Sequence, residues 1–270
     1  MVSISICFSQ EKKTLTLPES IVVGGFVGAA EVAMPGQVLS YAMNKTIAKE
    51  SFVLAQSYKG FCMNAGAQMP IMAIENGIKT KGLEMLQKTQ ESALSEMQKT
   101  GISFAAGVGG AVVENPSNAI QLYQQHKNNA GISVWQASNK LGLKGCCRGF
   151  VPGAILKEGP FVVGYQVLGS KGEIIAKEYV DHDMAAKAIG GIGAGVITAV
   201  VTQPGAVMRN TMQLDKTHAS TWKTAHKILN EQGFKGFFAG LHHRGARIAV
   251  AIPLFIIYSE ALEKVVKNKL

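Results

Sequence analysis

Charged side chains are scarce in this sequence. Asp, Glu, Lys and Arg make up 17% of its 270 residues, whereas soluble domains have about 25%. With a hydrophobic content of 47%, this scarcity excludes an intrinsically disordered chain, which needs low hydrophobicity and high charge. The four cysteines include no CxxC pair, which excludes a disulfide-rich scaffold. We expect them to be reduced and mostly buried, and we expect no metal site.

Aromatic residues are also few, at 7%, while Lys and Arg exceed Asp and Glu by 27 to 18, giving a net charge of +9. A nucleic-acid surface needs basic residues clustered among aromatics, and here the basic residues are spread thinly. We therefore expect no nucleic-acid partner, and we assign the charge to an anionic membrane surface or solute. The first 18 residues contain no Arg and no basic region followed by an apolar run, so we expect neither a secretory signal nor a transit peptide.

Long uncharged segments are the main positive feature. Ala188 to Met208 is about 21 residues long, enough to span a bilayer. Five other segments are similar, two of them interrupted by Glu31 or Glu114: 20–44, 60–74, 101–126, 159–170 and 248–259. All mix small and polar residues with apolar ones, which suits helices packed around a watery path. The mean hydropathy of +0.15 fits six such spans; a glycine-rich soluble helical core is the alternative.

The segments also carry a repeat. Pro35, Pro116 and Pro204 follow glycine-rich runs and recur 81 and 88 residues apart. Gly191 and Gly195 form a pair suited to close helix crossing. A Lys-Gly step, Lys59-Gly60, Lys144-Gly145 and Lys235-Gly236, recurs downstream. Each third thus has a span kinked by proline, a loop with a short surface helix, a Lys-Gly turn and a second span.

Two connecting regions have patterns of their own. Thr221 to Glu231 predicts a short amphipathic helix whose apolar face contains Trp222, Ala225, Ile228 and Leu229. Lys79 to Thr100 is rich in Lys, Glu and Gln, and we expect it to be a linker that includes the solvated end of the second span.

This organisation resembles the mitochondrial carrier family over about residues 20–265. The third repeat is the most similar, because Pro204 to Gln213 (PGAVMRNTMQ) looks like the P-x-[DE]-x-x-[KR] signature with its trailing Gln. The resemblance implies an all-α membrane protein with six transmembrane helices in three repeats, 1–100, 101–184 and 185–270. It also implies a monomeric transporter of the mitochondrial inner membrane, with no covalent chemistry or cofactor. The lipid partner that it implies is cardiolipin.

The family's charged signature positions form a ring of ion pairs that closes the matrix side, and here they are degenerate. The acidic positions hold Gln37, Asn118 and Ala206, and the basic positions hold Ser40, Gln121 and Arg209. Neutral hydrogen bonds contribute about 1 kcal/mol each, roughly half of charge-assisted ones. We therefore predict a weak matrix gate; decay of these positions after loss of transport is the alternative. The degeneration suggests a divergent member, encoded by a pathogen or an endosymbiont.

The resemblance also places substrate contacts on the even-numbered helices, at Ile71, Leu156 with Lys157, and Arg247. Arg244 lies three residues before Arg247, on roughly the same helix face. An intramembrane charge predicts a functional role, although Arg244, Lys157 and Glu158 could instead lie at solvated helix ends. Further candidates for the cavity are Gln68, Asn64, Glu31 and Glu114, the two carboxylates being expected to pair with Arg209, Arg244 or Arg247.

An apolar wall opposite these cations predicts an anion with a flat part, which a nucleotide such as ATP or ADP fits better than a keto acid, carboxylate or phosphate. Arg209-Asn210-Thr211-Met212 lacks the run of arginines and methionines that marks the ADP/ATP exchanger. Two other classes remain open. One is a carrier-fold adaptor that no longer transports, and the other is a soluble dinucleotide enzyme with a glycine-rich loop at Gly191 to Gly195.

Overall fold

The computed structural model describes residues 36–89, 94–129, 131–215 and 220–249, and this part of the chain is helical and contains no strand. Pro35 and Glu31 lie outside the described residues. The eight described α-helices are α2 (Gln37–Ala48), α3 (Phe61–Thr89), α4 (Glu96–Gln125), α5 (Val134–Cys146), α6 (Gly159–Val163), α7 (Gly169–Lys177), α8 (Asp183–Leu214) and α9 (Thr221–Gln232). Residues 241–249 are also helical.

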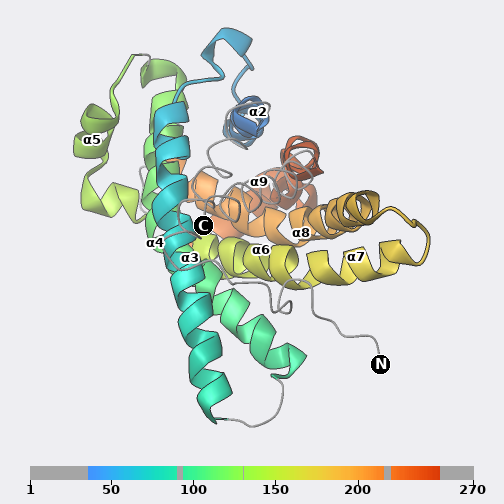
Figure 1. Ribbon diagram of the computed structural model, residues 1–270. Helices are drawn as coiled ribbons and strands as arrows, with labels where there is room; N and C mark the ends of the chain where they lie inside the picture. Colours follow the sequence, from blue (N-terminus) through green and yellow to red (C-terminus); the bar gives the residue numbers. More distant parts are fainter. Residues whose placement is uncertain (1–35, 90–93, 130, 216–219, 250–270) are drawn as a thin grey trace, which may run out of the picture.

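The long helices form two packed groups (Figure 1). Helices α3 and α4 run side by side, and α7 packs along α8. Two π-helical segments, Pro152–Glu158 and Gly164–Leu168, join α6 and α7 into a nearly continuous helix. Among the described helices, α8 alone is long and apolar enough to cross a membrane by length and composition.

Pro116 and Pro204 lie inside α4 and α8, and the amide residue before each proline ties its helix to the segment after a Lys-Gly step. Asn115 Nδ2 donates to the carbonyl oxygens of Cys146 at 2.9 Å and Arg148 at 3.2 Å. Gln203 Nε2 donates to the carbonyl oxygen of Ala239 at 2.6 Å. The proline and the Lys-Gly step that recur in the sequence are therefore linked by hydrogen bonds next to Pro116 and next to Pro204.

A short surface helix follows each of these long helices. Ser133 caps α5 in a capping box with Gln136, and Ser220 caps α9. In α9, Ile228 is 1% exposed and packs with Val207 and Met208. Trp222 and Leu229 are 72% and 47% exposed, so the predicted apolar face is wrong at these two positions.

Two other expectations need correction. The region from Lys79 to Thr100 is mostly helical, because α3 continues to Thr89 and α4 begins at Glu96. Lys, Glu and Gln are strong helix formers. They therefore extend the helices α3 and α4 beyond the ends of the uncharged segments. The cysteines are not mostly buried either: Cys146 is buried, but Cys62 and Cys147 are exposed.

Glycines allow α7 and α8 to approach closely. A Cβ atom on Gly190 would lie 2.5 Å from the carbonyl oxygen of Gly172, so the two backbones are nearly in contact. Gly191 and Gly195, the pair recognised in the sequence, are buried on α8. This close contact between α7 and α8 lies at Gly190, next to the predicted pair.

Candidate functional site

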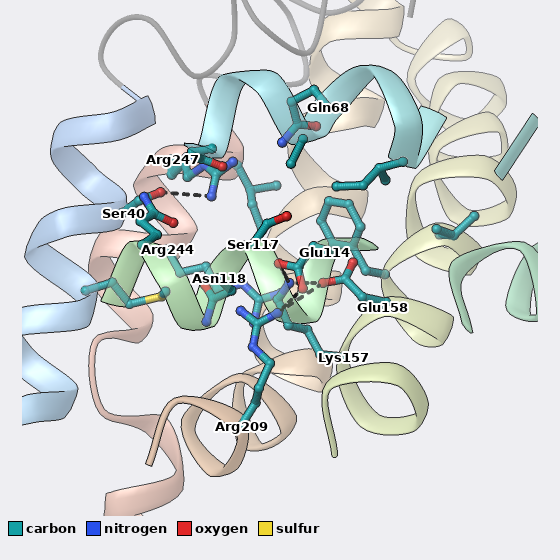
Figure 2. Close-up of a pocket in the computed structure, with 18 of the residues that line it drawn as sticks. Ser40, Gln68, Glu114, Ser117, Asn118, Lys157, Glu158, Arg209, Arg244 and Arg247 are labelled. Carbon is teal, nitrogen blue, oxygen red and sulfur yellow. Dashed lines mark hydrogen bonds and ion pairs between the residues drawn. The ribbon is translucent and has the colours of Figure 1, made fainter. Parts of the chain in front are cut away.

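A cavity of about 200 Å³ lies between α2, α3, α4, the Pro152–Glu158 segment, α8 and the helix 241–249. Figure 2 shows charged side chains converging on it from several of these helices. Its charged lining residues in the described part of the chain are Lys157, Arg209, Arg244 and Arg247, with Glu75, Glu114 and Glu158. Four cations against three carboxylates leave the lining with one net positive charge when all are ionised.

Glu114 organises one side of the cavity. One of its oxygens forms a close ion pair with Arg209, and the other accepts from Lys157 Nζ at 2.9 Å. Glu158 also contacts Lys157 closely, and its Oε1 is 3.7 Å from Arg209. The predicted pairing of Glu114 with Arg209 is confirmed, whereas the sequence did not identify Lys157 as a second partner. This arrangement balances two buried cations with two carboxylates.

Arg244 and Arg247 enter the cavity from the helix 241–249. Arg244 is 6% exposed and donates to Thr202 O at 3.1 Å and Gln203 Oε1 at 3.5 Å. Within the described ranges no carboxylate forms an ion pair with it. Arg247 donates to Ser40 Oγ at 2.9 Å. A guanidinium can bind a carboxylate or phosphate through two parallel hydrogen bonds, so this side of the cavity is suited to an anion.

Four of the predicted gate positions, Ser40, Asn118, Gln121 and Arg209, line the cavity. Gln121 Nε2 donates to Gln37 Oε1 at 3.3 Å, and Gln37 Nε2 donates to the carbonyl oxygens of Ser57 and Lys59. Ser40 accepts from Arg247 instead of from another gate residue. The structure thus joins α2 to α4 through neutral amides.

Asn118 belongs to a further amide network that the sequence analysis missed. Its Nδ2 donates to Asn210 Oδ1 at 3.0 Å and to Gln213 Oε1 at 2.6 Å. Asn210 in turn donates to Asn44 Oδ1 at 3.0 Å, and Asn44 donates to Gln125 Oε1 at 2.7 Å. The network therefore links α2, α4 and α8.

A signal for this network was present in the sequence. Asn44, Gln125 and Gln213 each lie four residues after a predicted gate position, namely Ser40, Gln121 and Arg209. Residues four apart share a helix face, so a second polar layer one turn further along could have been anticipated.

The remaining predicted residues divide into two groups. Gln68, Asn64 and Ile71 line the cavity. Leu156 does not line the cavity: its side chain is 42% exposed, and its backbone packs against Gly205. Glu158 and Arg244 are buried, and the side chain of Lys157 is 13% exposed and paired with two carboxylates, which removes the alternative of solvated helix ends. No group of three or more His, Cys, Asp or Glu in the described ranges is arranged to hold a metal ion.

Two comparisons with known proteins found similar sequences. Residues 180–270 match the family model of the mitochondrial carrier protein. The mitochondrial substrate carrier family protein H of Dictyostelium discoideum is 24% identical over 216 residues, which cover 68% of this chain and 57% of that protein. The match thus spans little more than half of the relative's length. The chain is thus similar to mitochondrial carrier proteins, over its last third by the family model and over about two thirds of its length by this relative.

Proposed function

We propose that this protein carries an anionic metabolite across the mitochondrial inner membrane by alternating access. The observation that carries the proposal is the buried Arg244, which lines a net-positive cavity and has no carboxylate partner among the described residues. A buried cation without a counter-charge is costly, and a bound anion would provide that charge. Such a carrier works because its substrate binds differently to two states of a gate.

The proposal includes three repeats, at 1–100, 101–184 and 185–270, that form six transmembrane helices. Helices α4 and α5 and helices α8 and α9 support it, since each pair has a long helix with an internal proline followed by a Ser-capped short helix. We propose a monomer in the inner membrane with cardiolipin as a lipid partner. Co-flotation of the full chain with inner-membrane vesicles tests its location, and recovery in the soluble fraction would contradict it.

We propose a nucleotide such as ATP or ADP as the substrate. Ile71, Phe161 and Tyr165 line the cavity together with Arg244 and Arg247. Apolar and aromatic side chains offer a surface on which a base can stack, while the two guanidinium groups suit phosphate oxygens.

The size of the cavity favours a second candidate, a smaller carboxylate, keto acid or phosphate. Pockets that hold drug-sized ligands have volumes of about 300–1,000 Å³, and this cavity measures about 200 Å³. A small dianion would need no further opening of the helices to fit between the cations.

Uptake by proteoliposomes that contain the purified full chain distinguishes these candidates. Labelled ATP, ADP, 2-oxoglutarate and phosphate are offered separately, and empty liposomes serve as the control. Saturable uptake of at least one anion is expected, and the preferred anion identifies the class. Absence of uptake for all four would contradict transport and favour the adaptor that binds a partner without transporting.

A further inference from the structure

Glu75 is a buried carboxylate that the anion site does not account for. It lies on α3, one turn after Ile71, is 9% exposed and lines the cavity. The backbone of α4 lies close to it, since a Cβ on Gly110 would come within 2.5 Å of Glu75 Oε1. The absence of a side chain at Gly110 thus makes the space that the carboxyl group occupies.

Within the described part of the chain, no hydrogen bond or ion pair is made by Glu75. The nearest charged groups on the packed elements are Glu114 on α4 and Lys157 on the following segment. Lys157 is already held by Glu114 and Glu158. The other charges around the cavity are those of Arg209 on α8 and of Arg244 and Arg247 on the helix 241–249.

A carboxylate that is buried without a hydrogen-bond donor is costly when it is charged, and a proton removes that cost. The cavity gives a proton a route to Glu75, because the carboxyl group lines it. We propose that Glu75 binds a proton that travels with the anion, so that the protein is a proton–anion symporter. This inference rests on the proposed transport function and deepens it by naming a co-substrate.

The charge count explains why the proton and the anion would be coupled. With Glu75 protonated and the other groups ionised, the lining has four cations against two carboxylates instead of three. The anion therefore binds more tightly when the proton is present, and by thermodynamic reciprocity the anion raises the affinity for the proton. The proton enters the carboxyl group from one compartment and leaves to the other when the anion dissociates.

The test uses the full chain in proteoliposomes that enclose a pH-sensitive dye, with labelled ADP, 2-oxoglutarate and phosphate as probes. In the wild type, protons should enter with the anion, and the apparent affinity should weaken up to about tenfold per unit rise in pH while one proton is linked. Glu75→Gln retains the shape of the neutral carboxyl group. It should take up the anion without proton entry and without this pH dependence.

Glu84→Gln is the matched control, because Glu84 is on the same helix but pairs with Lys81 on the surface; it should behave like the wild type. Equal proton entry in the wild type and Glu75→Gln, or anion uptake by the wild type without proton entry, would overturn the inference and leave transport standing.

A second readout does not depend on transport. The infrared band of a protonated carboxyl group should be present in the wild type and Glu84→Gln at neutral pH and absent from Glu75→Gln. Uptake of no probe would contradict the proposed function and the symport that rests on it. An identical band in the wild type and Glu75→Gln would overturn the proton site at Glu75 itself, whether or not a probe is taken up.

Discussion

The buried cation Arg209 shows how a nearby carboxylate compensates for buried charge in this protein. Its side chain is 1% exposed, and it pairs with Glu114, which also holds Lys157. The cost of burying such ions is several kcal/mol each and is offset only when their partners are well placed. One carboxylate therefore maintains two cations in the cavity wall.

Replacing this carboxylate should weaken the fold. We expect Glu114→Gln to lower the free energy of unfolding by about 3–5 kcal/mol, because it leaves Arg209 and Lys157 to share Glu158. Thermal unfolding of the detergent-purified chain measures this loss. Glu231→Gln, at an exposed position of α9, is the control. An equal melting temperature for Glu114→Gln and Glu231→Gln would show that Glu114 is not the stabilising counter-charge.

Prediction of single residues succeeded where the free-energy cost of placing a charge in an apolar helix indicates a function. Charges inside or just before uncharged segments, such as Glu114, Lys157 and Arg244, are conspicuous in the sequence, and all three line the cavity. It failed at Leu156, which was located by counting along an α-helix. Leu156 lies in a π-helical segment, where the wider turn shifts the register of the side chains. The inward position therefore belongs to the neighbouring Lys157.

At the scale of elements, close helix packing depends on individual glycines and not on glycine content. Gly190 faces the backbone of Gly172 across the contact between α7 and α8. A Cβ atom on Gly193 would have no heavy atom of the described residues within 4 Å. Both glycines belong to the same helix, so they form a matched pair.

Alanine at these two positions should have opposite effects. Gly190→Ala should destabilise the chain by about 1–3 kcal/mol, because its methyl group forces two backbones apart. Gly193→Ala should be neutral or stabilising by up to about 1 kcal/mol, because alanine favours a helix over glycine. Denaturant or thermal unfolding of both variants checks this order, and equal stabilities would refute the packing assignment.

The elements were partly predictable. The uncharged segments gave the long helices, but not their ends, because charged helix formers extend α3 and α4 beyond them. In α9, Trp222 and Ile228 are six residues apart, roughly 120° around a helix of 3.6 residues per turn. The sequence analysis assigned this wide arc to one apolar face. In the structure, only the part of the arc around Ile228 packs against α8.

At the scale of the whole molecule, neutral amides connect α2 to α4 and α8 beside the cavity, and Lys45 Nζ adds a charge-assisted bond from α2 to the carbonyl oxygen of Gln125 at 2.7 Å. Gln121 bonds to Gln37 between α4 and α2, and Asn210 bonds to Asn44 between α8 and α2. Neutral hydrogen bonds of about 1 kcal/mol each support the hypothesis of a gate that opens easily and permits net transport as well as exchange.

Restoring charge at this gate should slow transport. The double variant Gln37→Asp with Gln121→Lys should form an ion pair across the 3.3 Å contact and stabilise the closed state, since charge-assisted bonds are roughly twice as strong. Initial uptake rates in proteoliposomes measure the effect, with each single variant as a control for an unpaired charge. A double variant as fast as the wild type, or faster, would count against the gate hypothesis.

The resemblance to mitochondrial carriers was predictable from the sequence because two landmarks recur together three times. The substrate was not, because the apolar and cationic lining of the cavity suits several anions, and the origin in a pathogen or endosymbiont stays a prediction. The amide network was missed although Asn44, Gln125 and Gln213 each lie four residues after a predicted gate position, because neutral side chains do not stand out in an uncharged segment as charged ones do. Physical reasoning thus identified the cavity's charges except Glu75, but not the second layer of amide contacts around Asn118.

The most direct test of anion transport compares uptake by the wild type and Arg247→Ala in proteoliposomes, with the panel of ATP, ADP, 2-oxoglutarate and phosphate. Lys223→Ala, at an exposed position of α9, is the control. Loss of a charge-assisted hydrogen bond of 1.5–3 kcal/mol should reduce uptake at low substrate roughly 10- to 150-fold in Arg247→Ala. Lys223→Ala should match the wild type. Uptake by Arg247→Ala equal to that of the wild type, or no uptake by the wild type, would contradict the account.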